Sequence, residues 1–178
     1  MDEWTRFVET HPGTDAIIRV LNRRSVRGRK VLQKLIYFLQ EAEREPLGFD
    51  YRMYYYGPYS ATLDARLQTL SAVGLLSAPP DSEGIATFSP TSESTALIQP
   101  DPAVDQKIDR LLSNVGGILP NDVELLATVH FLAKESAKRG PFDEGKIARQ
   151  VRAWKGEKFS RAEIDSAISR LRGWGYLD

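Results

Sequence analysis

The feature that most constrains this chain is a stretch near its end that repeats a stretch of its first half. Residues 61–76 align with residues 162–177 without a gap, each residue lying 101 positions after its equivalent. Apolar residues recur at helical spacing in both copies, as expected for helices that bury one stripe. The equivalent apolar pairs are Leu63 and Ile164, Leu67 and Ile168, and Val73 and Trp174.

Each copy then reaches a glycine followed by apolar residues, a pattern typical of a helix C-cap that leads into a strand. A helix, a glycine and a short strand are the elements with which the third helix of a winged helix-turn-helix unit enters its wing. Because a repeat constrains the whole fold, we predict a mostly α protein with short β hairpins, built from tandem winged helix-turn-helix-like units.

The predicted boundary between the units lies near residue 100. Residues 1–100 form an N-terminal unit with a Gly-Pro-Tyr-Ser turn, and residues 101–178 form a C-terminal unit. The second unit is the more regular, and Ser160 and Glu163 fit a capping box at the start of its last helix. In the first unit an alternating aromatic strand over residues 49–56 replaces the middle helix, and residues 1–12 form a lead-in.

Composition excludes several classes of site and compartment. The chain has no cysteine, which rules out disulfides and thiolate metal sites. No apolar run approaches the roughly 18 residues of a membrane span, so we expect a cytoplasmic protein with no membrane partner. The 24 basic and 24 acidic side chains leave no net charge, so any binding to nucleic acid must depend on local charge.

Two motifs resemble a known family. They are Gly-Arg-Lys-Val-Leu-Gln-Lys-Leu-Ile-Tyr from residue 28 and Tyr-Tyr-Gly-Pro-Tyr-Ser from residue 55. Together with residues 124–132 they resemble the YwgA-like proteins and, more distantly, the Panacea domain of SocA-like antitoxins. The resemblance implies a winged-helix-like interaction module, found in part among antitoxins and regulators, with no established enzymatic activity and no catalytic residue to carry over.

A basic strip is the first candidate site. Seven cations and no acidic residue occur between Arg19 and Lys34, a density suited to phosphate contacts, although a solvated helix flank gives the same pattern. A second strip surrounds the last helix. The residues predicted to bind nucleic acid are Arg23, Arg24, Arg27, Arg29, Lys30, Lys158, Arg161 and Arg170.

Aromatic residues between positions 49 and 59 are the second candidate site. Alternation predicts that Phe49, Tyr51 and Tyr55 face the core. Tyr54, Tyr56 and Tyr59 then face outward, where flat amphipathic rings suit a partner-binding surface.

Catalysis has little support in the sequence. Nucleophilic and metal mechanisms need convergent His, Cys or carboxylate groups, so we predict no catalytic residue, no metal and no cofactor. His11 and His130 are interpreted as packed or half-exposed side chains, and Asp64 and Asp165 as acids in the first turns of their helices.

The sequence therefore predicts a non-enzymatic binding protein, either a winged-helix DNA-binding regulator or an antitoxin-like protein. The partner would be duplex DNA or a protein such as a toxin, and a homodimer is possible on this interpretation. The alternative is a protein-interaction module that does not touch nucleic acid. A hydrolase that depends on His130 is the third hypothesis.

Overall fold

The computed structural model describes residues 3–177, which form nine α-helices and five short strands. The helices are α1 (Glu3–Thr10), α2 (Thr14–Arg23), α3 (Arg29–Glu41), α4 (Ala61–Ala72), α5 (Ser92–Ala96), α6 (Pro102–Val115), α7 (Pro120–Ala137), α8 (Glu144–Lys155) and α9 (Arg161–Gly173). The strands are β1 (Val26–Arg27), β2 (Arg52–Tyr54), β3 (Gly57–Tyr59), β4 (Leu76–Ser77) and β5 (Thr87–Pro90). The prediction of a mostly α protein with short β hairpins is confirmed.

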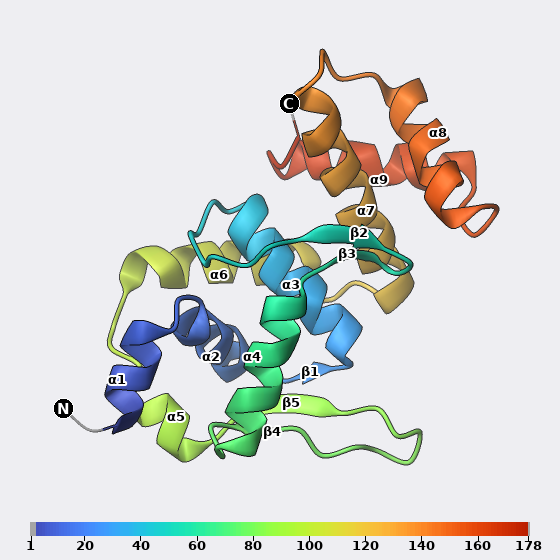
Figure 1. Ribbon diagram of the computed structural model, residues 1–178. Coiled ribbons are helices and arrows are strands. Elements are labelled where there is room, and N and C mark those ends of the chain that lie inside the picture. The colour runs from blue at the N-terminus through green and yellow to red at the C-terminus, as the bar shows by residue number, and fades with distance from the viewer. Residues whose placement is uncertain (1–2, 178) are drawn as a thin grey trace.

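Helix α3 lies at the centre of the molecule (Figure 1). Its apolar residues point in several directions, and Leu32, Ile36, Phe38 and Leu39 are all fully buried. It packs against α6 and α7 and against strands β1 and β3. Helices α7, α8 and α9 gather at one end of the molecule, while α1, α2, α4 and α5 lie at the other (Figure 1).

The strands form two small antiparallel sheets. One has the order β1-β5-β4, with Val26 opposite Phe88 and Leu76 opposite Pro90. The other is the β2-β3 hairpin, in which Met53 faces Pro58. This hairpin contacts both α3 and α7, so it sits where the two halves of the chain meet.

The internal repeat is confirmed at the level of the helix and its C-cap. Helices α4 and α9 bury equivalent residues, and the amide of Leu75 donates to the carbonyl of Leu70 at 2.9 Å just as Tyr176 donates to Leu171 at 2.9 Å. The glycines before Leu75 and Tyr176 both have positive φ. The capping box of Ser160 is present as predicted.

The two copies then diverge. After α4 the chain enters β4, which pairs with β5, whereas no strand follows α9 in the part of the chain that the structure describes. The second wing is therefore not observed, and winged-helix units are not confirmed. The division into units at residue 100 stays a prediction.

Two local predictions were wrong. Residues 3–10 form helix α1 instead of an irregular lead-in, and residues 1 and 2 lie outside the described part. The Gly-Pro-Tyr segment that was predicted to be a turn forms strand β3. Pro58 pairs with Met53 across the hairpin, and the turn lies just before β3, at residues 55 and 56.

Candidate functional site

The basic strip predicted at residues 19–34 is divided among several acidic partners. Arg23 lies 2.5 Å from Asp109 of α6, and Arg27 lies 2.7 Å from Asp81 in the loop between β4 and β5. Arg19 is only 5% exposed. These arginines join neighbouring elements, so the strip does not form one unpaired cationic surface.

Three other predicted cations are exposed and line neither of the cavities described below. Arg24 follows α2, and Arg161 pairs with Asp165 on its own helix at 2.7 Å. The guanidinium of Arg170 lies 5.3 Å from the ring centroid of Trp174. The contacts of Arg161 and Arg170 are local to α9 and its C-cap, and they suit a solvated helix surface.

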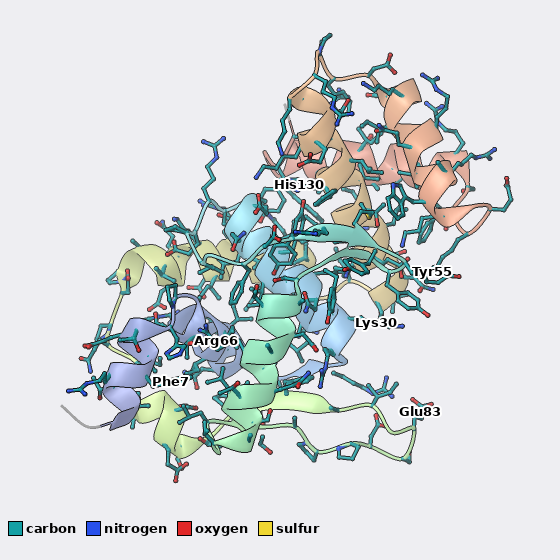
Figure 2. All side chains as sticks on the ribbon, in the orientation of Figure 1. Phe7, Lys30, Tyr55, Arg66, Glu83 and His130 are labelled. Carbon is teal, nitrogen blue, oxygen red and sulfur yellow. The ribbon has the colours of Figure 1, made fainter. Side chains whose placement is uncertain are left out.

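The remaining predicted residues come together at one place. They are Arg29, Lys30, Tyr54, Tyr56, Tyr59 and Lys158. The sequence placed them in two separate surfaces, one for nucleic acid and one for a protein partner. Figure 2 shows Lys30 at one end of α3 and Tyr55 at the tip of the β2-β3 hairpin, on the same side of the molecule. We name the group Lys30, Lys34, Tyr54, Tyr56, Glu124, Lys155 and Lys158 the lysine–tyrosine site.

A cavity of about 540 Å³ lies between the hairpin and α3. Tyr54 and Tyr56 form one side of it, and these residues are 52% and 41% exposed. Lys30 lies on the other side, with its Nζ 3.1 Å from the centroid of the Tyr56 ring, a cation–π contact. We call this space the tyrosine cavity.

The prediction that Tyr54 and Tyr56 face outward is confirmed, but that for Tyr55 was wrong. Tyr55 is 74% exposed, because it occupies the tip of the hairpin where strand alternation has ended. Tyr59 is half-buried, while Phe49 is buried as predicted.

A smaller cavity of about 190 Å³ adjoins the first and is lined by lysines. Lys30 and Lys34 reach it from α3, and Lys158 reaches it from the turn between α8 and α9. The two cavities share Lys30, Lys34 and Tyr56 as lining residues. We call this second space the lysine cavity.

Glu124 organises the lysines around the lysine cavity. Its carboxylate lies 2.7 Å from the Nζ of Lys155 and 2.9 Å from that of Lys158. Burial opposes its charge, but the hydrogen bonds from these two lysines lower its pKa. Glu124 therefore stays ionised and holds the lysines in place. With Lys30 and Lys34 included, four cations surround one anion.

Lys34 is the most unusual group of the site. It is 3% exposed, and its Nζ donates to the carbonyl of Pro58 at 2.7 Å. Burial lowers its pKa to about 8, and the nearby Glu124 only partly offsets this effect. At neutral pH the site therefore keeps a buried cation that is poorly compensated.

Gly57 allows the hairpin to approach this cluster. Its φ is +90°, and a Cβ atom there would lie 2.9 Å from Oγ1 of Thr128 and 3.4 Å from Cε of Lys34. A side chain at this position would push the hairpin away from α3 and α7. The glycine is thus needed for both its conformation and its contact.

Helix α7 starts at the lysine cavity. Pro120 and Asn121 line the cavity, and the N-cap position belongs to Leu119, whose side chain has no oxygen to accept a backbone hydrogen bond. Backbone amides at a helix N-terminus favour anions. This helix end therefore adds to the positive potential of the lysines.

His130, the candidate base of the hydrolase hypothesis, lies at another place on α7. Its Nδ1 is 2.7 Å from the hydroxyl of Tyr37, and it is 4% exposed. Burial lowers its pKa to about 4, so it is neutral at physiological pH. It borders a cavity of about 830 Å³ that Glu41, Lys134 and other residues also line. Glu41 and Lys134 form an ion pair there. Because His130 is buried and hydrogen-bonded to Tyr37, it is a packed side chain, as the sequence indicated.

The sequence missed part of the site. Lys34 belonged to the basic strip but was not chosen, although it lies four residues after Lys30 and so shares a helix face with it. Lys155 belonged to the second basic strip, around the last helix, and was likewise not chosen. Glu124 occurs in an apolar helix, and a buried acid in such a context is a signal for a cationic partner.

Comparisons with known proteins identify relatives that are named DNA ADP-ribosyl glycohydrolase. The chain is 30% identical to the DNA ADP-ribosyl glycohydrolases of Mycobacterium tuberculosis and Mycobacterium bovis over 151 residues, which cover 79% of the chain and 43% of each relative. It is 30% identical to the protein of the same name from Thermus aquaticus over 160 residues, 84% of the chain and 42% of that relative. The chain thus spans less than half the length of these curated relatives.

No protein-family model matches the chain. The resemblance to YwgA-like proteins and to the Panacea domain therefore stays a prediction. Among residues 3–177, no helix combines the length and the apolar character needed to cross a membrane.

These relatives correct the functional prediction from sequence. A non-enzymatic regulator, an antitoxin-like protein and a pure protein-interaction module are all contradicted, because the curated relatives are named as hydrolases. A hydrolase was only the third hypothesis from the sequence, because the chain lacks the usual catalytic motifs. The prediction of DNA as a partner is compatible with the relatives' name, whereas a toxin-like protein partner and a homodimer receive no support.

Proposed function

We propose that this chain takes part in the enzymatic removal of ADP-ribose from DNA, and that its lysine–tyrosine site binds the ADP-ribosylated strand. The observation that supports this most is the meeting of three lysines, Lys30, Lys34 and Lys158, and exposed tyrosines at one pair of cavities. Such a surface combines the two properties that nucleic-acid binding needs, which are cations for phosphates and flat rings for bases.

The site contributes binding and charge in this proposal. Glycoside hydrolysis commonly uses two carboxylates. Asp64 and Glu124 line the two cavities, but Arg29 lies 2.7 Å from Asp64, and two lysines pair with Glu124. We therefore assign no proton transfer to either acid.

The test uses the full chain and a DNA oligonucleotide carrying a single ADP-ribosyl group. We expect the chain to bind it, and to bind less tightly as salt rises because counterions are released. A Lys30→Gln, Lys158→Gln double variant should lose about tenfold in affinity, in line with two lost phosphate contacts. Release of ADP-ribose by the protein, measured chromatographically, should fall in parallel.

Lys138→Gln is the matched control. Lys138 is exposed near the end of α7 and pairs with Glu135, so its loss removes one positive charge without altering the site. If the double variant and this control bind the modified oligonucleotide equally well, the proposal is wrong.

A further inference from the structure

We infer that the cavity of about 830 Å³ beside the C-terminal half of α7 is a groove that binds an extended segment of another polypeptide as a β-strand. The segment carries an aromatic side chain between small polar residues. We call this cavity the strand groove. Among the described residues it shares none with the tyrosine cavity or the lysine cavity, so the inference goes beyond the proposed function and does not depend on it.

Strand β5, in the first half of the chain, shows what the strand groove would hold. It is the middle strand of its sheet, between β1 and β4, and Phe88 at its centre is 1% exposed. Helix α2 packs against the same strand. Three elements therefore surround β5, namely the helix α2, the connection from α2 to α3 that contains β1, and the segment that follows α4.

The corresponding three elements line the strand groove. The repeat equates α9 with α4, so residues 175–177 correspond to residues 74–76, where β4 begins. In chain order, α7 and the connection at residues 140–142 precede α8 and α9 as α2 and β1 precede α3 and α4. Residues 140–142, residues 175–177 and the α7 residues Ala133 and Ala137 all line the groove. Figure 1 shows both segments near the same end of α7.

The second half of the chain has the borders of such a sheet without its middle strand. The five strands found among residues 3–177 belong to the β1-β5-β4 sheet and the β2-β3 hairpin, and neither includes these two segments. A sheet edge that lacks a neighbour is a template for pairing with another chain. The repeat therefore indicates where a strand would be added and which elements it would lie between.

Backbone groups for this pairing are available on the side of residues 140–143. In the first half, the amide of Gly28, the N-cap of α3, donates to the carbonyl of Ala86 just before β5 at 2.9 Å. The corresponding N-cap of α8 is Asp143, so its amide would donate to the added strand. Pro141 has no N–H and could only accept. In strand addition, such main-chain hydrogen bonds provide affinity and side-chain pockets provide specificity.

The walls of the strand groove select a neutral segment with an apolar centre. Both acids that line it are already paired, Glu41 with Lys134 and Glu45 with Lys107 at 2.8 Å. The apolar walls come from Ala133, Ala137, Leu47, Phe142 and Leu177. The sequence of β5, Thr-Phe-Ser-Pro, has this character. A second copy of the chain does not offer its own β5, because that strand is paired on both edges.

The test uses the full chain and a fluorescent peptide with the sequence of residues 85–91, Ile-Ala-Thr-Phe-Ser-Pro-Thr. We expect fluorescence anisotropy to show binding. A Phe88→Ser version of the peptide should bind at least about tenfold more weakly, because it buries no aromatic side chain. Hydrogen exchange should show that the bound peptide protects residues 140–143 and 175–177.

Ala137→Trp tests the position of the peptide. Ala137 is exposed and lines the strand groove, so the larger side chain fills the groove without entering the core. Peptide affinity should fall at least about tenfold. The matched control is Ala153→Trp, at an exposed alanine of α8 that does not line the groove, and it should bind the peptide as the wild type does. Neither variant should change binding of the ADP-ribosylated oligonucleotide.

Four results would overturn the inference. The first is no binding of the peptide at millimolar concentration, and the second is equal affinity for the Phe88→Ser version. The third is protection confined to residues 26–28, which would mean that the peptide replaces β5 in its own sheet. The fourth is a dimer of the free chain, seen by light scattering and dissociated by Ala137→Trp, which would assign the groove to a second copy.

Discussion

The packing between α3 and α7 has two ends that differ in chemistry. At one end Tyr37 and His130 form a buried, neutral hydrogen bond. At the other end Lys34 approaches Glu124 among further lysines, and charge is left over. The same pair of helices therefore uses one end to stabilise the fold, while the other end keeps a cation where burial disfavours it. Perturbed pKa values such as that of Lys34 cluster at functional sites.

The largest expected effect is at the neutral end. His130→Ala should lower the free energy of unfolding by about 3 kcal/mol, because it opens a cavity and leaves the buried Tyr37 hydroxyl without its partner. Urea denaturation of the variant measures this loss. Binding of the ADP-ribosylated oligonucleotide by the folded variant should be unchanged, and a loss of binding with intact stability would break the comparison.

Acid should act at the same end, with an effect of similar size. His130 has a folded-state pKa of about 4, below its unfolded value of about 6.5. Its contribution to stability is complete above pH 6.5 and is lost as the pH falls toward 4, because the unfolded chain then binds the extra proton. We expect about 3 kcal/mol of stability to disappear over this window.

His130→Gln is the comparison for the acid effect, since glutamine does not titrate. Denaturation curves collected from pH 7 to pH 4 should show a shallower decline for this variant than for the wild type. Identical slopes would mean that other groups dominate the acid response.

The smallest expected effect has the opposite sign and lies at the charged end. Lys34→Met should raise the free energy of unfolding at pH 7 by about 1 kcal/mol, because it replaces a buried cation by an apolar side chain of similar length. The lowered pKa predicts that this gain shrinks as the pH rises from 8 toward 10.5, where the wild-type amine becomes neutral.

Binding distinguishes this variant from an ordinary stabilised mutant. Affinity for the ADP-ribosylated oligonucleotide should fall in Lys34→Met even though the protein is more stable. A destabilised Lys34→Met would show that the hydrogen bond to Pro58 outweighs the cost of burying the charge, and the contrast between the two ends would then be weaker than proposed.

The sequence predicted the helical skeleton well, because periodicity and capping are local signals. The Ser160 capping box and the glycine-terminated helix ends appear where the pattern placed them. The second wing, which is not observed among residues 3–177, shows the limit of this approach. A wing needs a partner strand to form a hairpin, and repeat identity in the helix does not provide one.

The site was only half predictable for a similar reason. Lys30, Tyr56 and Lys158 were recognised, but as members of different surfaces. Their meeting depends on a hairpin that contacts both α3, which begins at Arg29, and α7, which begins at Pro120, and no local pattern encodes that contact. Glu124 was missed because its partners come from a distant turn.

The contact between Lys155 and the hairpin has a consequence for the integrity of the chain. Lys155, from the last third of the sequence, donates a hydrogen bond to the carbonyl of Tyr55 in the first third, and it also holds Glu124. A protease cut in the segment before α6, followed by separation of the fragments, would leave each fragment with only some of the lysines. The surface needs residues from both halves of the chain. Transfer of one half to another protein by recombination would therefore not transfer this surface.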